Sequence, residues 1–225
     1  MEYQERITKE NIEKDILRVI DGLDAEQGHA FAILSRGFEI GELNGATDYT
    51  MAYLFALVAA YAGSSDGWNN LGWLTLNGYG CNQDMDLARS CFKQAISIDD
   101  KNATAMVNLG NTYDSTLYPS ADDKKKAYKW YKRAAELQDA RGLYNVANCL
   151  RYEYGIKKNH KKAFKIFKKI YKDSRDAEAT FHLGLYYQEG LWVKKNLKKA
   201  HKYYSEAAQD EEYAIKALKR IRKKV

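Results

Sequence analysis

The sequence predicts an all-α solenoid, a stack of about five helix-turn-helix repeats, because three features recur together about every 37 residues. The first is a leucine, replaced by valine in the fourth copy, followed by a small residue. The second is alanine, replaced by methionine in the first copy, and the third is aromatic. A fixed period in this range is typical of solenoids, in which each unit buries its hydrophobic face on its neighbours. The first feature lies at Leu34-Ser35, Leu71-Gly72, Leu109-Gly110, Val146-Ala147 and Leu183-Gly184; the second at Met51, Ala88, Ala127, Ala163 and Ala200; the third at Phe55, Phe92, Tyr131, Phe167 and Tyr204.

Each repeat is expected to contain a helix A, a loop and a helix B. In the second repeat Gly67, Leu71 and Leu74 follow the i, i+4, i+7 spacing of one helical face. A small residue that recurs within helix A indicates close contact with another helix. Helix B begins where a side-chain oxygen can cap the exposed N–H groups. These expected caps are Thr47, Asp84, Asp123, Asn159 and Asn196.

The repeats are expected to lie between two capping helices, because a solenoid must cover its terminal hydrophobic faces. An amphipathic helix within residues 1–25 carries Ile12, Ile16, Val19 and Ile20 on one side. A basic amphipathic helix is expected over residues 212–225. Between them, the solenoid occupies residues 26–211, with repeats at about 27–63, 64–101, 102–138, 139–174 and 175–211.

Composition favours a cytoplasmic protein without a cofactor. No signal peptide is visible among the charged residues at the start of the chain, and the apolar stretch from Met51 to Gly63 is too short to span a bilayer. Three cysteines without close pairing fit a reducing compartment. We expect no metal site, since the sequence has no CxxC motif and no histidine pair at ligand spacing. Gly78-Tyr79-Gly80 lacks the GK[ST] ending of a phosphate loop.

The charge of the chain is strongly divided. Residues 1–66 carry five Lys or Arg and 12 Asp or Glu, whereas residues 121–225 carry 28 and 13. Such a division orients charged partners over long distances.

The repeat pattern resembles the Sel1-like repeat, a relative of the tetratricopeptide repeat. The resemblance is carried best by the segments Ala105 to Ala135 and Ala179 to Ala208, which follow the pattern AxxxLGxxY…GxG…D/NxxKAxxWYxxAA, although the first of them lacks the glycine pair in its loop. It implies a right-handed α-superhelix that acts as an adaptor in protein complexes, and it supplies no catalytic residues. Some relatives use cysteines spaced within each repeat for disulfides, and this chain lacks that spacing.

By the same resemblance, helix A would line a concave face that binds a partner. Asparagine amides there can hold a peptide backbone, Arg151 can take a carboxylate, and exposed aromatics can act as hot spots. Alternatively, the asparagines bond across adjacent A helices and the aromatics pack in the core. The partner-binding residues that this geometry selects are Arg36, Glu39, Asn69, Trp73, Leu76, Asn111, Asp114, Tyr144, Asn148, Arg151, Tyr152, Phe181 and Gln188.

These observations predict a non-enzymatic scaffold that binds a protein or peptide on its concave face. A short repeat stack with oppositely charged ends also suggests a bacterial immunity protein that clamps a toxin. The alternative of a different class is a nucleic-acid-binding protein that uses the basic C-terminal half. An enzyme, or a membrane-surface role for the basic C-terminal helix, has less support, because no acid pairs with a base at an interpretable spacing and the helix has a narrow apolar face. The sequence does not indicate an oligomeric state.

Overall fold

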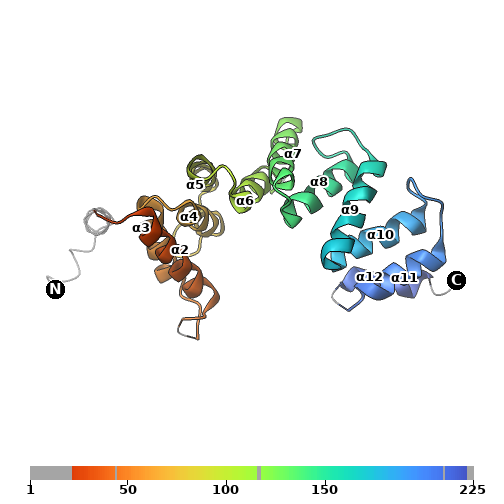
Figure 1. The fold of residues 1–225 in the computed structure, drawn as a ribbon, viewed down its shortest axis with the longest axis horizontal. Helices are drawn as coiled ribbons and strands as arrows, with labels where there is room; N and C mark the ends of the chain where they lie inside the picture. The colour runs from red at the N-terminus through yellow and green to blue at the C-terminus, as the bar shows by residue number, and fades with distance from the viewer. Residues whose placement is uncertain (1–21, 44, 116–117, 210, 222–225) are drawn as a thin grey trace. The chain divides into compact units, whose positions relative to one another are not determined.

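The structure is a computed structural model that describes residues 22–43, 45–115, 118–209 and 211–221. In these residues it is entirely α-helical, with 11 helices and no strand, which confirms the predicted fold class (Figure 1). Most of the N-terminal helix expected within residues 1–25 lies outside the described residues, as do the last four residues of the chain.

The helices alternate between helix A and helix B of successive repeats. The A helices are α2 (Ala25–Ile40), α4 (Ser65–Asn77), α6 (Ala103–Asp114), α8 (Ala140–Tyr152) and α10 (Ala177–Glu189). The B helices are α3 (Tyr49–Tyr61), α5 (Met85–Ile98), α7 (Ala121–Glu136), α9 (His160–Ser174) and α11 (Leu197–Ala207), and a final helix, α12, covers Glu212–Ile221. The chain divides into two compact units, one ending at Thr112 and the other beginning at Tyr113. We describe each unit by itself.

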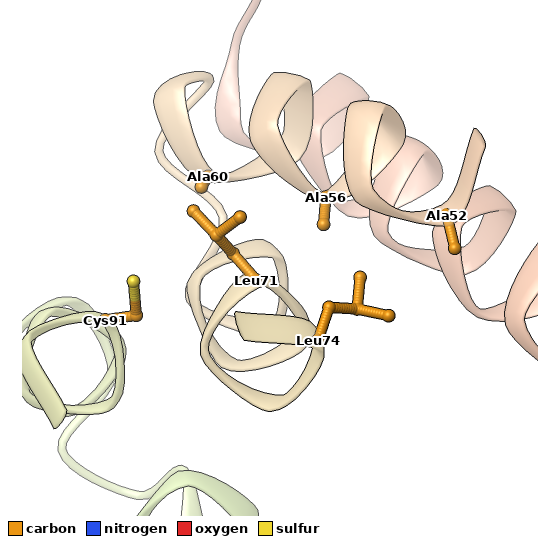
Figure 2. Close-up of a cluster of buried hydrophobic side chains, with 6 residues drawn as sticks. All are labelled: Ala52, Ala56, Ala60, Leu71, Leu74 and Cys91. Carbon is orange, nitrogen blue, oxygen red and sulfur yellow. The ribbon is translucent and has the colours of Figure 1, made fainter. Parts of the chain in front are cut away.

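The core of the first unit is built by large side chains of one helix that pack on small ones of the next. Leu71 and Leu74 of α4 point toward Ala52, Ala56 and Ala60 of α3, and Cys91 of α5 completes the cluster (Figure 2). All six are buried. Alanine at three successive turns of α3 lets the two helix backbones approach closely, so the leucines fill the space between them.

In the second unit, helix α12 covers the last repeat. Its Ala214 and Ile221 are buried with Ala200, Tyr204 and Ala207 of α11. The cations Lys216, Lys219 and Arg220 of the same helix remain exposed. One side of α12 therefore extends the core, and the other carries positive charge.

The recurring small residue lies where helix A meets the aromatic or small side chain of its own helix B. A Cβ built on Gly184 would lie 2.5 Å from the ring of Tyr204, and one on Gly72 would lie 2.8 Å from the ring of Phe92. In the first repeat Ser35 is fully buried and its hydroxyl donates to the carbonyl of Ala52 at 2.8 Å. The small residue predicted within helix A is therefore a contact site between paired helices.

Three of the five predicted helix B caps are confirmed, because the side chains of Asp84, Asn159 and Asn196 accept from backbone N–H groups of the first turn. Two are wrong. Asp48, not Thr47, caps α3, so the first repeat is shifted by one residue and Ala52, not Met51, is its fully buried small residue.

The second wrong cap concerns α7. Ser120 caps this helix, and Asp123 is the third helical residue, whose carboxylate accepts from the backbone N–H of Ser120 at 3.3 Å. The two residues form a reciprocal capping box that adds a turn to the helix. Asp123 has the spacing of the other caps, so a comparison of the repeats places the start of α7 at Asp123 and misses the additional turn.

In two repeats a loop glycine lies against the preceding helix B. Gly155 has φ +68°, and a Cβ at this position would collide with the backbone carbonyl of Lys124 in α7. Gly80, with φ +72°, lies equally close to the carbonyl of Tyr49 in α3. Only glycine combines this left-handed backbone with so close an approach.

We expect Gly184→Ala to destabilise the protein by about 1–3 kcal/mol, because the added methyl group overpacks the contact with Tyr204. Urea denaturation followed by circular dichroism measures the change. If the ring is the cause, the same substitution costs less in a Tyr204→Leu background, which removes the obstructing atoms. An equal cost in both backgrounds would contradict this explanation.

Candidate partner-binding site

The A helices of the first unit enclose a shallow hollow of about 400 Å³. Arg36 of α2 and Thr104 of α6 lie in its lining, and Ile33 and Ile40 of α2 contribute apolar surface that is 61% and 49% exposed. His29 and Asp66 lie 3.3 Å apart at the same hollow. The hollow thus offers apolar contact area together with charges of both signs.

Two asparagines of this hollow bond across adjacent A helices. Asn69 of α4 is 7% exposed, and its side-chain oxygen accepts from the amide of Asn108 in α6 at 2.9 Å. The amide of Asn70 donates to the carbonyl of Ala32 in α2 at 3.0 Å. Asn69 therefore behaves as the alternative interpretation of the sequence predicts: it joins neighbouring repeats, and one of its polar atoms is already occupied.

The remaining residues selected in the first unit do not gather at one point. Glu39 is half-buried, and burial raises the pKa of its carboxyl, although Arg36 opposes the shift. Trp73 packs against the core cluster and its ring centroid lies 5.3 Å from that of Tyr79. Leu76 is half-buried and Asn111 is exposed. Of the six selected residues in this unit, only Arg36 and Asn69 line the hollow.

In the second unit, a polar network joins α8 to α10. Arg151 of α8 is only 6% exposed, and its guanidinium lies 2.6 Å from Nδ1 of His182 and 3.6 Å from the carboxylate of Glu189. The hydroxyl of Tyr144 lies 3.1 Å from Nε2 of the same histidine. Arg151, selected as a receptor for a partner's carboxylate, is therefore already paired with groups of its own chain.

The network determines the protonation of His182. A guanidinium can only donate, so Nδ1 accepts from Arg151 and the ring proton is on Nε2, which donates to the Tyr144 oxygen. Burial, reinforced by the charge of Arg151, lowers the pKa of His182 to about 3. The ring stacks on Phe167 of α9 at 4.6 Å between centroids. A neutral histidine thus links three helices.

Tyr152 is the most exposed of the selected aromatics. Its side chain is 59% exposed, and the guanidinium carbon of Arg151 lies 5.0 Å from its ring centroid. A second ring, the buried Tyr186, lies 5.5 Å from the same guanidinium. Beside them the side-chain oxygen of Asn148 is buried without a hydrogen-bond partner. The network therefore supports an exposed tyrosine next to an unsatisfied acceptor.

The other selected residues of the second unit serve its own packing. Gln188 accepts from the hydroxyl of Tyr204 at 3.0 Å, and Asp114 accepts from that of Tyr131 at 3.4 Å. Phe181 is half-buried between the rings of Tyr204 and Tyr213.

Sequence reasoning missed His182 as the centre of this network. It considered histidines only as metal ligands and gave His182 no role, although this residue follows the selected Phe181. Glu189 lies one repeat after Tyr152, but His182 lies one position beyond the register of Tyr144, which Phe181 occupies. A comparison of residues at equal register in successive A helices therefore does not find His182.

The described residues offer little for covalent or metal chemistry. Burial raises the pKa of the thiols of Cys91 and Cys149 to about 12, so both remain protonated at neutral pH. Among the described residues, no three or more His, Cys, Asp or Glu side chains gather where they could hold a metal ion. No helix in the described part of the chain is long and apolar enough to cross a bilayer.

The sequence matches the Sel1 repeat at residues 69–100, 103–139, 140–173 and 177–211, which is more than half of the chain. The chain belongs to the Sel1 repeat family. Sel1 repeats form helical scaffolds suited to protein–protein interaction, and they bind protein or peptide partners. No curated protein matches the sequence.

Solved structures share the Sel1 fold. One is a protective antigen of uropathogenic Escherichia coli, 27% identical, with a TM-score of 0.78 over 89% of this chain and 43% of that protein. This chain therefore spans less than half of the antigen's length. A Sel1 repeat protein from Oxalobacter formigenes is 23% identical, with a TM-score of 0.73 over 86% of this chain and 78% of that one. An immunity protein from Pseudomonas aeruginosa is 18% identical, with a TM-score of 0.53 over 82% and 66%.

We expect acid to weaken the second unit through His182. The folded-state pKa of about 3 lies below the ordinary value of 6.5. In that interval the unfolded chain binds a proton that the folded protein does not bind. The contribution of His182 to stability is therefore complete above about pH 6.5 and decreases as the pH falls, by about 1.4 kcal/mol per pH unit.

The measurement compares urea denaturation of the parent and of His182→Gln between about pH 7 and pH 4. Glutamine can accept from Arg151 and donate to Tyr144 but does not titrate in this range. The free energy of unfolding of the variant should depend on pH less than that of the parent, by the equivalent of about one proton, whereas the other three histidines remain in both proteins. Parallel profiles would refute the assignment.

Proposed function

We propose that this chain is a non-enzymatic cytoplasmic scaffold that binds a partner protein or peptide through the exposed faces of its A helices. Its membership of the Sel1 repeat family supports a role in protein–protein interaction. The residues proposed to contact a partner are those of the A helices that keep exposed surface, above all Tyr152 in the second unit and Arg36 in the first.

The observation that carries this proposal is the support beneath Tyr152. The ring of Tyr152 lies over the guanidinium of its neighbour Arg151, which His182 and Glu189 of α10 hold in turn. A large amphipathic side chain held in one orientation loses little entropy on binding, and tyrosine and arginine are enriched among interface hot spots. The buried network would therefore serve to present Tyr152 to a partner.

The first unit would add a second contact region. Arg36 is exposed at the mouth of the hollow, and the apolar side chains of Ile33 and Ile40 lie beside it. A charged group at the rim of an apolar patch is the usual composition of a transient interface. Asn69 is proposed to shape this region from within rather than to bind directly, whereas Trp73 packs against the core cluster and does not line the hollow.

A narrower form of the proposal is an immunity function, in which the partner is a bacterial toxin that this protein clamps. The fold that this chain shares with the immunity protein from Pseudomonas aeruginosa supports it, because an immunity protein is already built on a scaffold of this kind. The charge division of the chain, acidic before residue 67 and basic after residue 120, would orient a charged toxin during approach. Co-expression with candidate toxins tests it: rescue of growth by the parent and not by Tyr152→Ala is expected.

Nucleic-acid binding is the competing function, favoured by the 28 Lys and Arg residues of residues 121–225. Binding through phosphates weakens steeply as salt rises. A gel-shift titration at low and at physiological salt therefore separates the two functions, since an absence of shift at low salt excludes this alternative.

The scaffold proposal is tested by site-specific photo-crosslinking with affinity purification of the full chain. A photoreactive residue at position 152 or at position 36 should capture the same partner. The control is Tyr118, which is 89% exposed but does not belong to an A helix. Tyr152→Ala should lower recovery of the partner about tenfold, as expected for a hot-spot aromatic, while Tyr118→Ala leaves it unchanged. Equal recovery with both variants would overturn the proposal.

A further inference from the structure

The second unit also carries a groove with an apolar floor and a rim of lysines. It has a volume of about 660 Å³ and lies between α7, α8 and α9. Val146 and Leu150 of α8 lie at its floor and are each 6% exposed, whereas Tyr128, Ile156 and Ile166 are half-buried. We call it the lysine-rimmed groove; its rim consists of Lys132, Lys157, Lys158, Lys162 and Lys165.

The rim has almost no counter-charge. No acidic side chain lines the groove. Of the five rim lysines, only Lys132 forms an ion pair with a described residue, Glu136 of its own helix at 3.5 Å, and both partners are more than half exposed. An exposed pair of this type contributes little. Four ammonium groups thus surround an apolar surface without a carboxylate within ion-pair distance.

The first unit contains the same groove with a neutral rim. It lies between α3, α4 and α5 and has a volume of about 920 Å³. Two repeats separate the grooves, and three floor positions correspond: Tyr53 to Tyr128, Leu71 to Val146, and Cys91 to Ile166. We call it the neutral groove.

The rims of the two grooves differ at positions of equal register. Asn82, Leu87 and Ser90 of the neutral groove correspond to Lys157, Lys162 and Lys165, and Leu57 corresponds to Lys132. The fold therefore forms such a groove without lysines, and Lys132, Lys157, Lys162 and Lys165 are additions to its rim. Solubility alone does not explain why the lysines surround an apolar floor, since charges on the outer face of α9 would serve as well.

From these observations we propose that the lysine-rimmed groove is a second docking surface, and that its occupant is an acidic, amphipathic segment of a partner protein. Apolar side chains of the segment would lie on Val146, Leu150 and Ile166, and its carboxylates would pair with the rim. Charge complementarity selects the occupant, because each carboxylate relieves repulsion among the lysines and the apolar floor adds contact that a purely acidic chain does not use. This surface is separate from the A-helix face of the proposed function, so either can fail without the other.

The experiment uses a phage-displayed library of random peptides, about 12 residues long, selected against the full chain. Enriched peptides should combine Asp or Glu with Leu, Ile or Phe. Their affinity, measured by fluorescence anisotropy, should fall as salt rises. Replacement of their apolar residues by serine should weaken binding at least about tenfold, which distinguishes a groove ligand from a polyanion.

Three variants assign the site. In K162E/K165E the rim charge is reversed, and in K162L/K165S the rim takes the residues of the neutral groove; both should bind the acidic peptides at least about tenfold more weakly. The control K194E/K198E makes the same charge change as the first variant at exposed lysines around the start of α11 and should bind like the parent. Melting curves establish that all three fold.

Several results would overturn the proposal. These are a selection that yields no peptides or only neutral ones, equal affinity for K162E/K165E and the parent, and equal loss in K194E/K198E, which would mean that only net charge matters. Tighter binding of a single-stranded oligonucleotide than of the selected peptides, with loss in K162E/K165E, would assign the groove to nucleic acid instead and would also refute it.

Discussion

The close approach of each helix A to its own helix B is the constraint on which the rest of the structure depends. At Gly184 and Gly72 the space that a side chain would need is occupied by the ring of Tyr204 or Phe92. Where the residue is Ser35, its hydroxyl is buried away from water and donates a hydrogen bond to the carbonyl of Ala52. A helix pair with a larger residue at this register would separate, and the next repeat would then lack the surface on which it packs.

This packing decides what the A helices can offer a partner. One side of each A helix packs in the core. Polar groups that are buried between neighbouring A helices must therefore form hydrogen bonds or ion pairs with one another. Asn108 and Asn69 do so with a single hydrogen bond, and Arg151 does so with His182 and Glu189. Polar residues in A helices therefore differ: some join repeats, and others, such as Arg36, keep exposed surface.

The sequence predicted the architecture well because residues that recur at the same position of the repeat make the same packing contact in successive repeats. It failed where one repeat departs from the period. The additional turn created by Ser120 and Asp123, and the shift from Met51 to Ala52, change the local register without changing the composition. The candidate site was less predictable, because exposure depends on neighbours in other repeats. Arg151 and Asn69 have the same residue types as good partner contacts, yet both are buried by groups 31 to 39 residues away.

The two grooves between successive B helices show how such a scaffold can change partners without loss of fold. Their floors must stay apolar, because Leu71 and Val146 also hold helix A in place. The rim residues do not hold a helix in place. The same position can therefore be Leu87 in one groove and Lys162 in the other at little cost to the stability of the core. Lysine suits this position because its aliphatic stem covers apolar surface while its ammonium group stays in water. Charge at the rim is therefore the property that repeats of this kind can alter most freely, and differences in rim charge between equivalent grooves indicate partner choice rather than stability.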